Sequence, residues 1–591
     1  MKSNSYLKNI IKQWDALNLK DKSLIVASLL AVIFSYLPTL EFDYVTQDQW
    51  RAFRYSILPQ SPSFRAKACI DMLSHFYPLT GRPFVWLGEC VEHSFVAKIS
   101  DFIYLRPFVL TVVLITVLYL GKILGLLMRN LAIGIAVASI FVLAPGYSFM
   151  YLQSMPALMV LGSILLAGAS FENLEKKLGG RGEIPARKLH YLITPFLFFI
   201  SACMIYPAWA FIVIPLAMIQ FGFNDQNPIK DKVRKFVSIL LSYFIFSLIY
   251  YLIVKIFLVI IKLKYGSIQD LGDYTVSMQL SPQTLWTRIK EATNYFYMMP
   301  PSNFYTPHGI TILLLSLYSF YIAKTMTKEQ GRSNVATFLL SIFFFLFNFI
   351  FFYASISPWL FSHMSALSTR HLIPWYLLFS AMFLGMIWKI FQSFNKITNY
   401  YAVFIIAFII FPIAANQNKL SFLEAEVSGI EIETMRLAIG KWLDEKGYLY
   451  SRFLLVVLPS QARLAYVERL FGKNFIAGEN TVLSSSQNPV SLPWMFNALL
   501  RERNDHPMGK KIDLTYCAFD QTCTESNLLN GKVVLELTYG NKLIQSSTIP
   551  YIINLSYLTS KPVNPIFKKL SKFTKKPTGQ MRLLQNNKSL P

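Results

Sequence analysis

Acidic and basic side chains follow the first apolar run of the chain, in the segment EFDYVTQDQWRAFRYS at 41–56. A carboxylate at the outer mouth of a helical bundle, partly removed from water, can act as a general base. It takes a proton from a hydroxyl group as the hydroxyl attacks. Asp48 is the first candidate for this role and Asp43 the second. The alternative is that either acid pairs with Arg51 or Arg54 at the membrane interface.

The same segment of the chain continues with YPLTGRPFVWLGECVEHS at 77–94. The sequence Gly-Arg-Pro around Arg82 predicts a turn, followed by an amphipathic helix at the membrane surface. Glu89, Glu92 and His93 have the spacing of one helical face. They are possible metal ligands, but such a set is more often the wet side of an interfacial helix. The sequence therefore favours the wet face of a helix here; it indicates no certain cofactor, and a divalent metal stays an unsupported alternative.

A third group of candidates lies in SISPWLFSHMSALSTRHLIPWYLL at 355–378. Arg370 and His371 precede an apolar run, which places them at the outer end of a helix. A cation at that depth can hold a phosphate attached to a lipid. The alternative is an arginine that reaches the lipid head groups without specificity. The segment 295–309 is rich in aromatic rings, which suit either sugar faces or a membrane interface.

The elements that must position these residues are membrane-spanning helices. Hydrophobic residues make up 54% of the 591-residue chain and charged residues 15%, with a mean hydropathy of +0.41. Soluble domains carry about 25% charged residues. The apolar runs at 237–261 and 334–354 are long enough to cross about 30 Å of hydrocarbon. The run at 23–40 follows a polar stretch and precedes no small-residue cleavage site, so it is expected to be a retained first helix.

We predict about eleven transmembrane helices. Pro207 divides a long apolar stretch, and a single re-entrant element there would reverse the orientation of everything downstream. The predicted spans are 23–40, 107–127, 131–146, 156–171, 190–206, 207–222, 236–262, 309–324, 334–354, 371–391 and 400–415.

Basic residues support this count because they fall on alternate loops. Lysine and arginine concentrate in the cytoplasmic loops of membrane proteins. Much of the formal charge of +24 therefore reflects membrane orientation and not a nucleic-acid partner. An odd number of spans with a cytoplasmic N-terminus puts the C-terminus outside. The basic clusters are Lys2 to Lys22, Arg129, Lys176 to Lys188, Lys230 to Lys235, Lys324 to Arg332, and Lys389 to Lys396.

The predicted domains are a transmembrane module over 1–415 and a soluble portion after it. The loops 41–106, 263–308 and 355–370 are expected to lie outside.

The C-terminal portion is predicted to be a small periplasmic α/β domain over 416–560. The segment 421–447 has helical periodicity, and 453–460 and 532–540 are typical of strands. A basic tail follows at 561–591, either attracted to anionic head groups and lipopolysaccharide or simply solvated.

Five cysteines are present, and two pairs of them fall in regions predicted to lie outside. Cys69 and Cys90 lie in the first large loop, and Cys517 and Cys523 in the C-terminal portion. An oxidising periplasm would allow two disulfides, although unpaired buried thiols fit equally well. The chain contains no P-loop, dinucleotide fingerprint or paired CxxC motif, which argues against a pump with its own nucleotide-binding domain.

With these residues in hand, the chain resembles the bacterial multi-spanning glycosyltransferases of the GT-C fold, and most of all the type II O-antigen glucosyltransferase group. That group has an acidic pair followed by arginine, then a Gly-Arg-Pro/Trp-Leu stretch, in the first periplasmic loop. The similar stretches here are QDQWR at 47–51 and TGRPFVWL at 80–87, with Gln47 in place of the first acid. TRHLIP at 369–374 is similar to the basic outer motif of many GT-C enzymes.

The resemblance implies a bacterial inner-membrane glycosyltransferase that works at the periplasmic face. Its donor would be a polyprenyl-phosphate sugar, a hexose such as glucose, and its acceptor a surface glycan or a lipid-linked glycan. Asp48 would activate the acceptor hydroxyl, and Arg370 with His371 would neutralise the departing phosphate. Arg51 and Arg82 would position the donor or brace Asp48.

Two other functions compete with this one. An O-antigen polymerase or ligase also combines many helices with large periplasmic loops, but its key residues are expected in central or late loops. A transporter or flippase of lipid-linked glycans predicts charges inside several spans, for which Lys122 and Lys255 are the candidates.

Overall fold

The structure is a computed structural model of the whole chain. It describes residues 17–41, 45, 62–63, 66–67, 69–70, 82–96, 98–144, 155–178, 190–223, 228–265, 281–298, 308–329, 333–360, 369–392, 398–446, 454–458, 495, 498–499, 514–516, 550–554 and 582–583. Asp43, Asp48 and Arg51 lie outside the described residues, as do Cys517 and Cys523.

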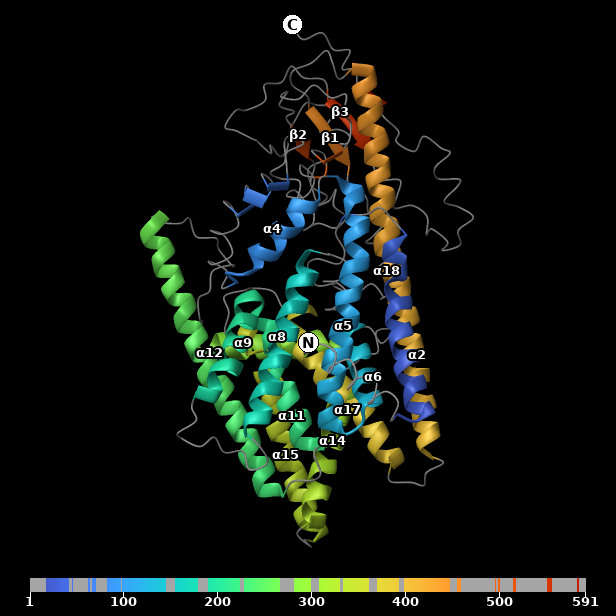
Figure 1. Cartoon of the computed structure of the whole chain (residues 1–591). Coiled ribbons are helices and arrows are strands. Elements are labelled where there is room, and N and C mark those ends of the chain that lie inside the picture. The colour runs from blue at the N-terminus through green and yellow to red at the C-terminus, as the bar shows by residue number, and fades with distance from the viewer. Residues whose placement is uncertain are drawn as a thin grey trace, which may run out of the picture.

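Helices make up most of the described chain (Figure 1). They are α2 (Leu19–Tyr36), η1 (Leu37–Leu40), α4 (Val85–Phe95), η3 (Ile99–Asp101), α5 (Phe102–Met128), α6 (Leu131–Val142), α8 (Met155–Leu178), α9 (Ile193–Ile205), α10 (Pro207–Ala210), α11 (Val213–Phe223), α12 (Ile229–Tyr265), α13 (Pro282–Met298), α14 (His308–Glu329), α15 (Asn334–Ala354), α16 (Ser357–Leu360), η6 (Thr369–Leu372), α17 (Ile373–Gln392) and α18 (Thr398–Lys446).

The protein is a helical membrane protein. The eleven predicted spans all overlap helices, but six of them correspond to described segments that are long and apolar enough to cross a bilayer, and the count of eleven stays a prediction. The six segments are Leu19–Leu40, Ile99–Met128, Ile229–Ile260, Asn334–Ala354, Ile373–Gln392 and Tyr401–Asn418, and four shorter apolar helices are Leu131–Val142, His190–Ile205, Pro207–Phe223 and Thr311–Thr327.

Glycines allow α5 and α6 to pack with their backbones in contact. Gly121 and Gly125 lie four residues apart on α5 and face Gly134 on α6. A Cβ atom on Gly134 would lie 2.6 Å from the Cα of Gly125, which no side chain tolerates. Two glycines at this spacing form a smooth helical surface that permits such an approach in membranes.

The segment 190–223 leaves one end of α8 and returns to the same end. The Nζ of Lys177 donates to the carbonyl of Tyr191 at 2.6 Å, just before α9. After the turn at α10, the Nε2 of Gln220 on α11 donates to Glu175 at 3.0 Å. The segment therefore adds an even number of crossings or none, and the orientation of the downstream helices is unchanged in either case.

The ends of the helices that carry basic residues meet at this end of the bundle. Lys122 of α5 lies 3.2 Å from Glu172 of α8, and Lys235 of α12 lies 2.5 Å from Glu175. Gly385 of α17 lies against Met128 at the end of α5. These contacts join the ends of α5, α8 and α12 that lie nearest to three of the predicted basic clusters.

The last helix, α18, is continuous over 49 residues. The prediction treated its two halves, 400–415 and 421–447, as separate helices, but no helix-breaking residue lies between them. It packs along α2, where the Oγ of Ser35 donates to the carbonyl of Ala414 at 3.2 Å and the rings of Phe34 and Phe411 stack. Figure 1 shows α18 continuing past the bundle, at the end where α4 lies.

Four short strands follow α18: β1 (Leu454–Leu458), β2 (Leu514–Tyr516), β3 (Pro550–Asn554) and β4 (Arg582–Leu583). They form one sheet in the order β2-β1-β3-β4. β1 is parallel to both neighbours, and β4 is antiparallel to β3. β1 agrees with the strand predicted at 453–460, whereas the strand predicted at 532–540 lies outside the described residues.

Candidate functional site

The Gly-Arg-Pro turn docks against the tip of the hairpin formed by α9, α10 and α11. The backbone N–H of Phe84 donates to the carbonyl of Met204 at 3.1 Å. This bond brings the Arg82 guanidinium over the ring of Tyr206, with 4.3 Å between Cζ and the ring centroid. The turn and the helix α4 after it confirm the prediction for this segment. Arg82 is therefore half-buried, with its guanidinium against the ring of Tyr206.

The position of Tyr206 follows from the proline after it. A residue that precedes proline is pushed out of the helical region, and Tyr206 is extended, with φ −152° and ψ 98°. Pro207 then starts α10, where a helix tolerates proline because its missing N–H would be unpaired anyway. The break turns the Tyr206 ring towards Trp209, edge to face, with 5.9 Å between the ring centroids. Tyr206 is buried, with 4% of its surface exposed.

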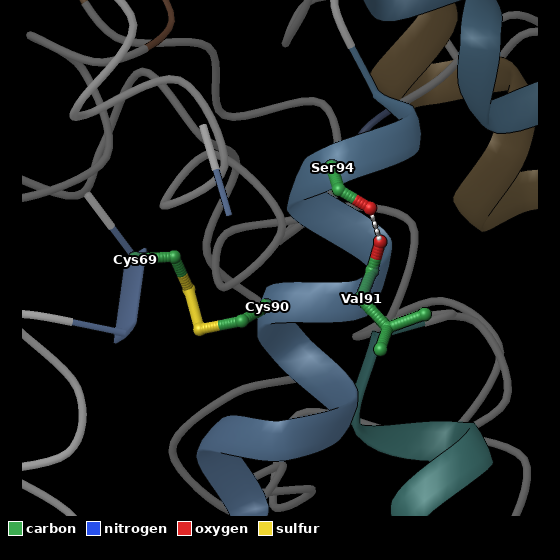
Figure 2. The surroundings of a disulfide bond; sticks show 4 residues. All are labelled: Cys69, Cys90, Val91 and Ser94. Atoms are coloured by element: carbon green, nitrogen blue, oxygen red, sulfur yellow. Dashed lines mark hydrogen bonds between the residues drawn. A yellow bond between two sulfur atoms is a disulfide. The ribbon is translucent and has the colours of Figure 1, made fainter. Parts of the chain in front are cut away.

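A disulfide joins Cys90 of α4 to Cys69 (Figure 2). It closes a loop across a separation of 21 residues, with 5.4 Å between the two Cα atoms. Of the two disulfides that the sequence allowed, this one forms, and the other falls on cysteines outside the described residues. Cys203 is a free buried thiol. The disulfide fastens the segment before the Gly-Arg-Pro turn to the helix after it.

The helix α4 turns its apolar side chains outward. Leu87, Val91 and Phe95 are exposed, whereas Glu89 is buried. An exposed apolar stripe is typical of a helix that lies in a membrane interface. The side chains of Glu92 and His93 lie outside the described residues. No three metal-ligating side chains lie together in the part of the chain that the structure describes.

His371 lies in η6, which packs against α10. Its side chain is buried, with 3% exposed. The next residues anchor η6, since the ring of Trp375 at the start of α17 stacks on Phe352 with centroids 4.3 Å apart. The side chain of Arg370 lies outside the described residues. The structure thus brings Arg82 to Tyr206, the residue before α10, and brings η6, which contains His371, against α10.

Arg288 is a buried cation that the sequence analysis missed. It lies on α13 and is 7% exposed. Its Nη1 donates to the carbonyl of Trp359 in α16 at 2.7 Å, and its Cζ lies 5.3 Å from the centroid of the Trp359 ring. Burial lowers the pKa of Arg288, and the charge of Glu291 opposes that shift. The spacing in the sequence could have indicated its burial, because Arg288 shares a helical face with the apolar residues Leu285 and Ala292.

Arg106 is a second buried cation outside the predicted set. It lies near the start of α5, is 2% exposed, and donates from Nη1 to the carbonyl of Thr39 in η1 at 3.1 Å. The acidic segment that contains Asp43 and Asp48 starts directly after η1. Arg106 therefore fixes the point at which that segment leaves the bundle.

Three of these features converge on α10. Arg82 lies over Tyr206, the residue before α10, and α10 packs against η6, which contains His371, and against α16, which Arg288 holds. Guanidinium groups at partly dry positions favour phosphate and carboxylate oxygens, because several N–H groups donate at once. The arrangement suits the binding of an anionic group close to the membrane.

Comparisons with known proteins add no relatives to this description. No protein-family model matches the chain, and no curated protein or solved structure matches it either.

Proposed function

We propose that the protein is a membrane glycosyltransferase that moves a sugar from a polyprenyl-phosphate donor to a surface glycan or a lipid-linked acceptor. The sugar would be a hexose such as glucose. The observation that carries the proposal is the meeting of two segments at the start of α10: Arg82 lies over Tyr206, the residue before α10, and η6, which contains His371, packs against α10. Arg82 comes from the predicted first loop and His371 from the start of the tenth predicted span, so a phosphate bound between them would contact both segments.

The reaction would need one base and a set of cations. The acceptor hydroxyl attacks the anomeric carbon, the bond from that carbon to the phosphate oxygen breaks, and the hydroxyl proton passes to Asp48 or, as the second candidate, Asp43. Polyprenyl phosphate leaves with the bonding electrons. Arg370 and His371 would stabilise its negative charge, and Arg51 and Arg82 would hold the donor.

The proposal includes a cytoplasmic N-terminus, eleven spans and a site on the periplasmic side of the inner membrane. The meeting of the basic helix ends at one end of the bundle supports this orientation, because such residues stay in the cytoplasm. The Cys69–Cys90 disulfide supports an oxidising environment at the other end. In this scheme the strands after α18 belong to a small periplasmic α/β domain, and the basic tail contacts membrane lipids.

The charges that favoured a transporter have other partners. Lys122 pairs with Glu172 where the basic helix ends meet, and Lys255 lies over the ring of Tyr251, 5.3 Å from its centroid. Neither forms the chain of charges along a pathway that a transporter needs. A polymerase or ligase differs from a side-branch transferase in its product, so analysis of the glycan distinguishes the two functions.

Glycan analysis of cells that lack the protein tests the proposal. Wild type is expected to restore one sugar side-branch, and Asp48→Asn is expected to restore none while still accumulating in the membrane. Asp101→Asn is the matched control, since Asp101 accepts from the backbone N–H of Lys98 at 2.9 Å, a bond that asparagine can keep. Shortened chains of unchanged composition would contradict a transferase and favour a polymerase. Full activity of Asp48→Asn would remove that residue from the mechanism.

A further inference from the structure

We propose that the hydroxyl of Tyr206 and the guanidinium of Arg82 together bind the phosphate of the polyprenyl-linked donor. The proposal rests on the proposed function and adds to it a binding residue that lies inside an apolar segment. Tyr206 would donate one hydrogen bond to a phosphate oxygen, and Arg82 would supply the positive charge and further donors.

The first reason is the state of the Tyr206 hydroxyl. Its oxygen is fully enclosed and has no hydrogen-bond partner among the described residues. Buried polar groups in proteins nearly always have a partner, because an unmade bond forfeits the solvation that water gave. Neighbouring tyrosines follow this rule: the hydroxyl of Tyr243 lies 3.1 Å from that of Ser170, and the hydroxyl of Tyr318 donates to the carbonyl of Met218 at 2.7 Å. The hydroxyl of Tyr206 differs from those of these two tyrosines, and its position next to Arg82 points to an anionic ligand.

The second reason is the charge beside that hydroxyl. Arg82 lies on the face of the Tyr206 ring, with 4.3 Å between its Cζ and the ring centroid. A guanidinium donates and never accepts, so it cannot itself satisfy a phenol that is to donate. An anionic oxygen would satisfy both groups, because it can accept hydrogen bonds from the phenol and the guanidinium and neutralise the positive charge.

The third reason is the depth of the pair. The carbonyl of Tyr206 accepts from the Oγ of Ser163 at 3.1 Å. Ser163 lies about 12 Å along α8 from Met155, where that helix begins. Beside the pair, α4 exposes Leu87, Val91 and Phe95. An anion that reaches this depth against an apolar surface is expected to be attached to an apolar chain.

Thermal unfolding of the purified full-length protein in a neutral detergent tests the proposal without a transferase assay. Farnesyl phosphate is the probe, farnesol is its uncharged match, and inorganic phosphate lacks the chain. A ligand that binds the folded protein raises the unfolding temperature. We expect farnesyl phosphate to raise it and farnesol to leave it unchanged. Protection by inorganic phosphate alone would overturn the assignment to a lipid-linked phosphate.

Tyr206→Phe is the decisive variant, and Tyr243→Phe is its matched control. Tyr206→Phe is expected to raise the dissociation constant for farnesyl phosphate by about 10-fold to 100-fold, the value of a hydrogen bond to a charged group. Without ligand its unfolding temperature should be unchanged or higher, because no internal bond is lost. Tyr243→Phe should do the reverse: it loses the bond to Ser170 and unfolds at a lower temperature, but it binds the probe as wild type does.

A double variant shows whether the two groups hold the same phosphate. If they do, Arg82→Gln with Tyr206→Phe loses less binding energy than the sum of the single losses. Unchanged binding of farnesyl phosphate by Tyr206→Phe would overturn the proposal, whether or not the unfolding temperature falls. The results distinguish a failure of this proposal from a failure of the proposed function. If Tyr206→Phe transfers sugar and binds the probe normally, Tyr206 is not part of the phosphate site, but the protein can still be a transferase. If the protein binds the probe but transfers no sugar, the phosphate site remains and the transferase function is contradicted.

Discussion

Arg288 and Trp359 make two contacts with each other. The guanidinium donates to the Trp359 carbonyl and also lies over the Trp359 ring, so the short helix α16 is held to α13 by one side chain. The segment after α16 leads to Thr369 and η6, which contains His371. The exposed Trp286, in contrast, lies on the outer face of α13, as expected of a helix at the level of the lipid head groups.

Replacement of Arg288 should loosen this attachment. Arg288→Ala leaves the Trp359 carbonyl buried without its donor, which costs about 1–3 kcal/mol of unfolding free energy. Arg288→Lys keeps the charge but loses the planar contact with the ring, so an intermediate loss is expected. Thermal unfolding in detergent measures both variants. Thr287→Ala, next in the chain but exposed, is the control, and an equal loss there would show that Arg288 has no special role.

Substitution of Gly134 should prevent the packing of α5 on α6. Alanine is ordinarily the better helix former by about 1 kcal/mol, so a gain would be expected if the helix alone mattered. Here the added Cβ overlaps the backbone of α5, and overpacking of this kind costs about 1–3 kcal/mol or more. Gly162→Ala is the control, because its Cβ would meet Ile205 Cδ1 at an ordinary 3.8 Å. The yield and unfolding temperature of both purified variants measure the difference, and similar values would contradict the backbone contact.

The Cys69–Cys90 disulfide should be visible by thiol labelling of the denatured protein. In a background with Cys517→Ser and Cys523→Ser, the unreduced chain should take one maleimide tag, on Cys203, and the reduced chain three. Cys69→Ser with Cys90→Ser should lower the unfolding free energy by about 2–4 kcal/mol. Three tags without reduction would show that the bond does not form in cells.

Reporter fusions test the orientation of the chain. Alkaline phosphatase, which is active only in the periplasm, should be active when fused after Lys446, at the end of α18. It should be inactive when fused after Leu178, at the end of α8. Activity of the second fusion, or inactivity of the first, would contradict the predicted orientation of the bundle.

The sequence predicted the helices well because hydropathy decides which segments enter lipid. It did not predict the continuity of α18. Polar residues replace apolar ones after 415, which indicates where the chain leaves the membrane, but no helix-breaking residue there indicates whether the helix ends. Tyr206 resembled a core aromatic residue, and only its partners in space distinguish it from Tyr243 or Tyr318. Arg288 could not be distinguished in the sequence from a solvated loop residue, because its burial depends on the contact with α16. The acids at Asp43 and Asp48 stay a prediction from the sequence.

The continuous α18 carries the chain from its contact with α2 to a point beyond the bundle (Figure 1). Its 49 residues extend about 74 Å, with Pro412 inside the helix. A displacement of the far end of α18 therefore acts on α2, its partner along the bundle. The end of α2 passes through η1, held by Arg106, into the acidic segment. A displacement of the far end of α18 is thus expected to reach the place where that segment begins.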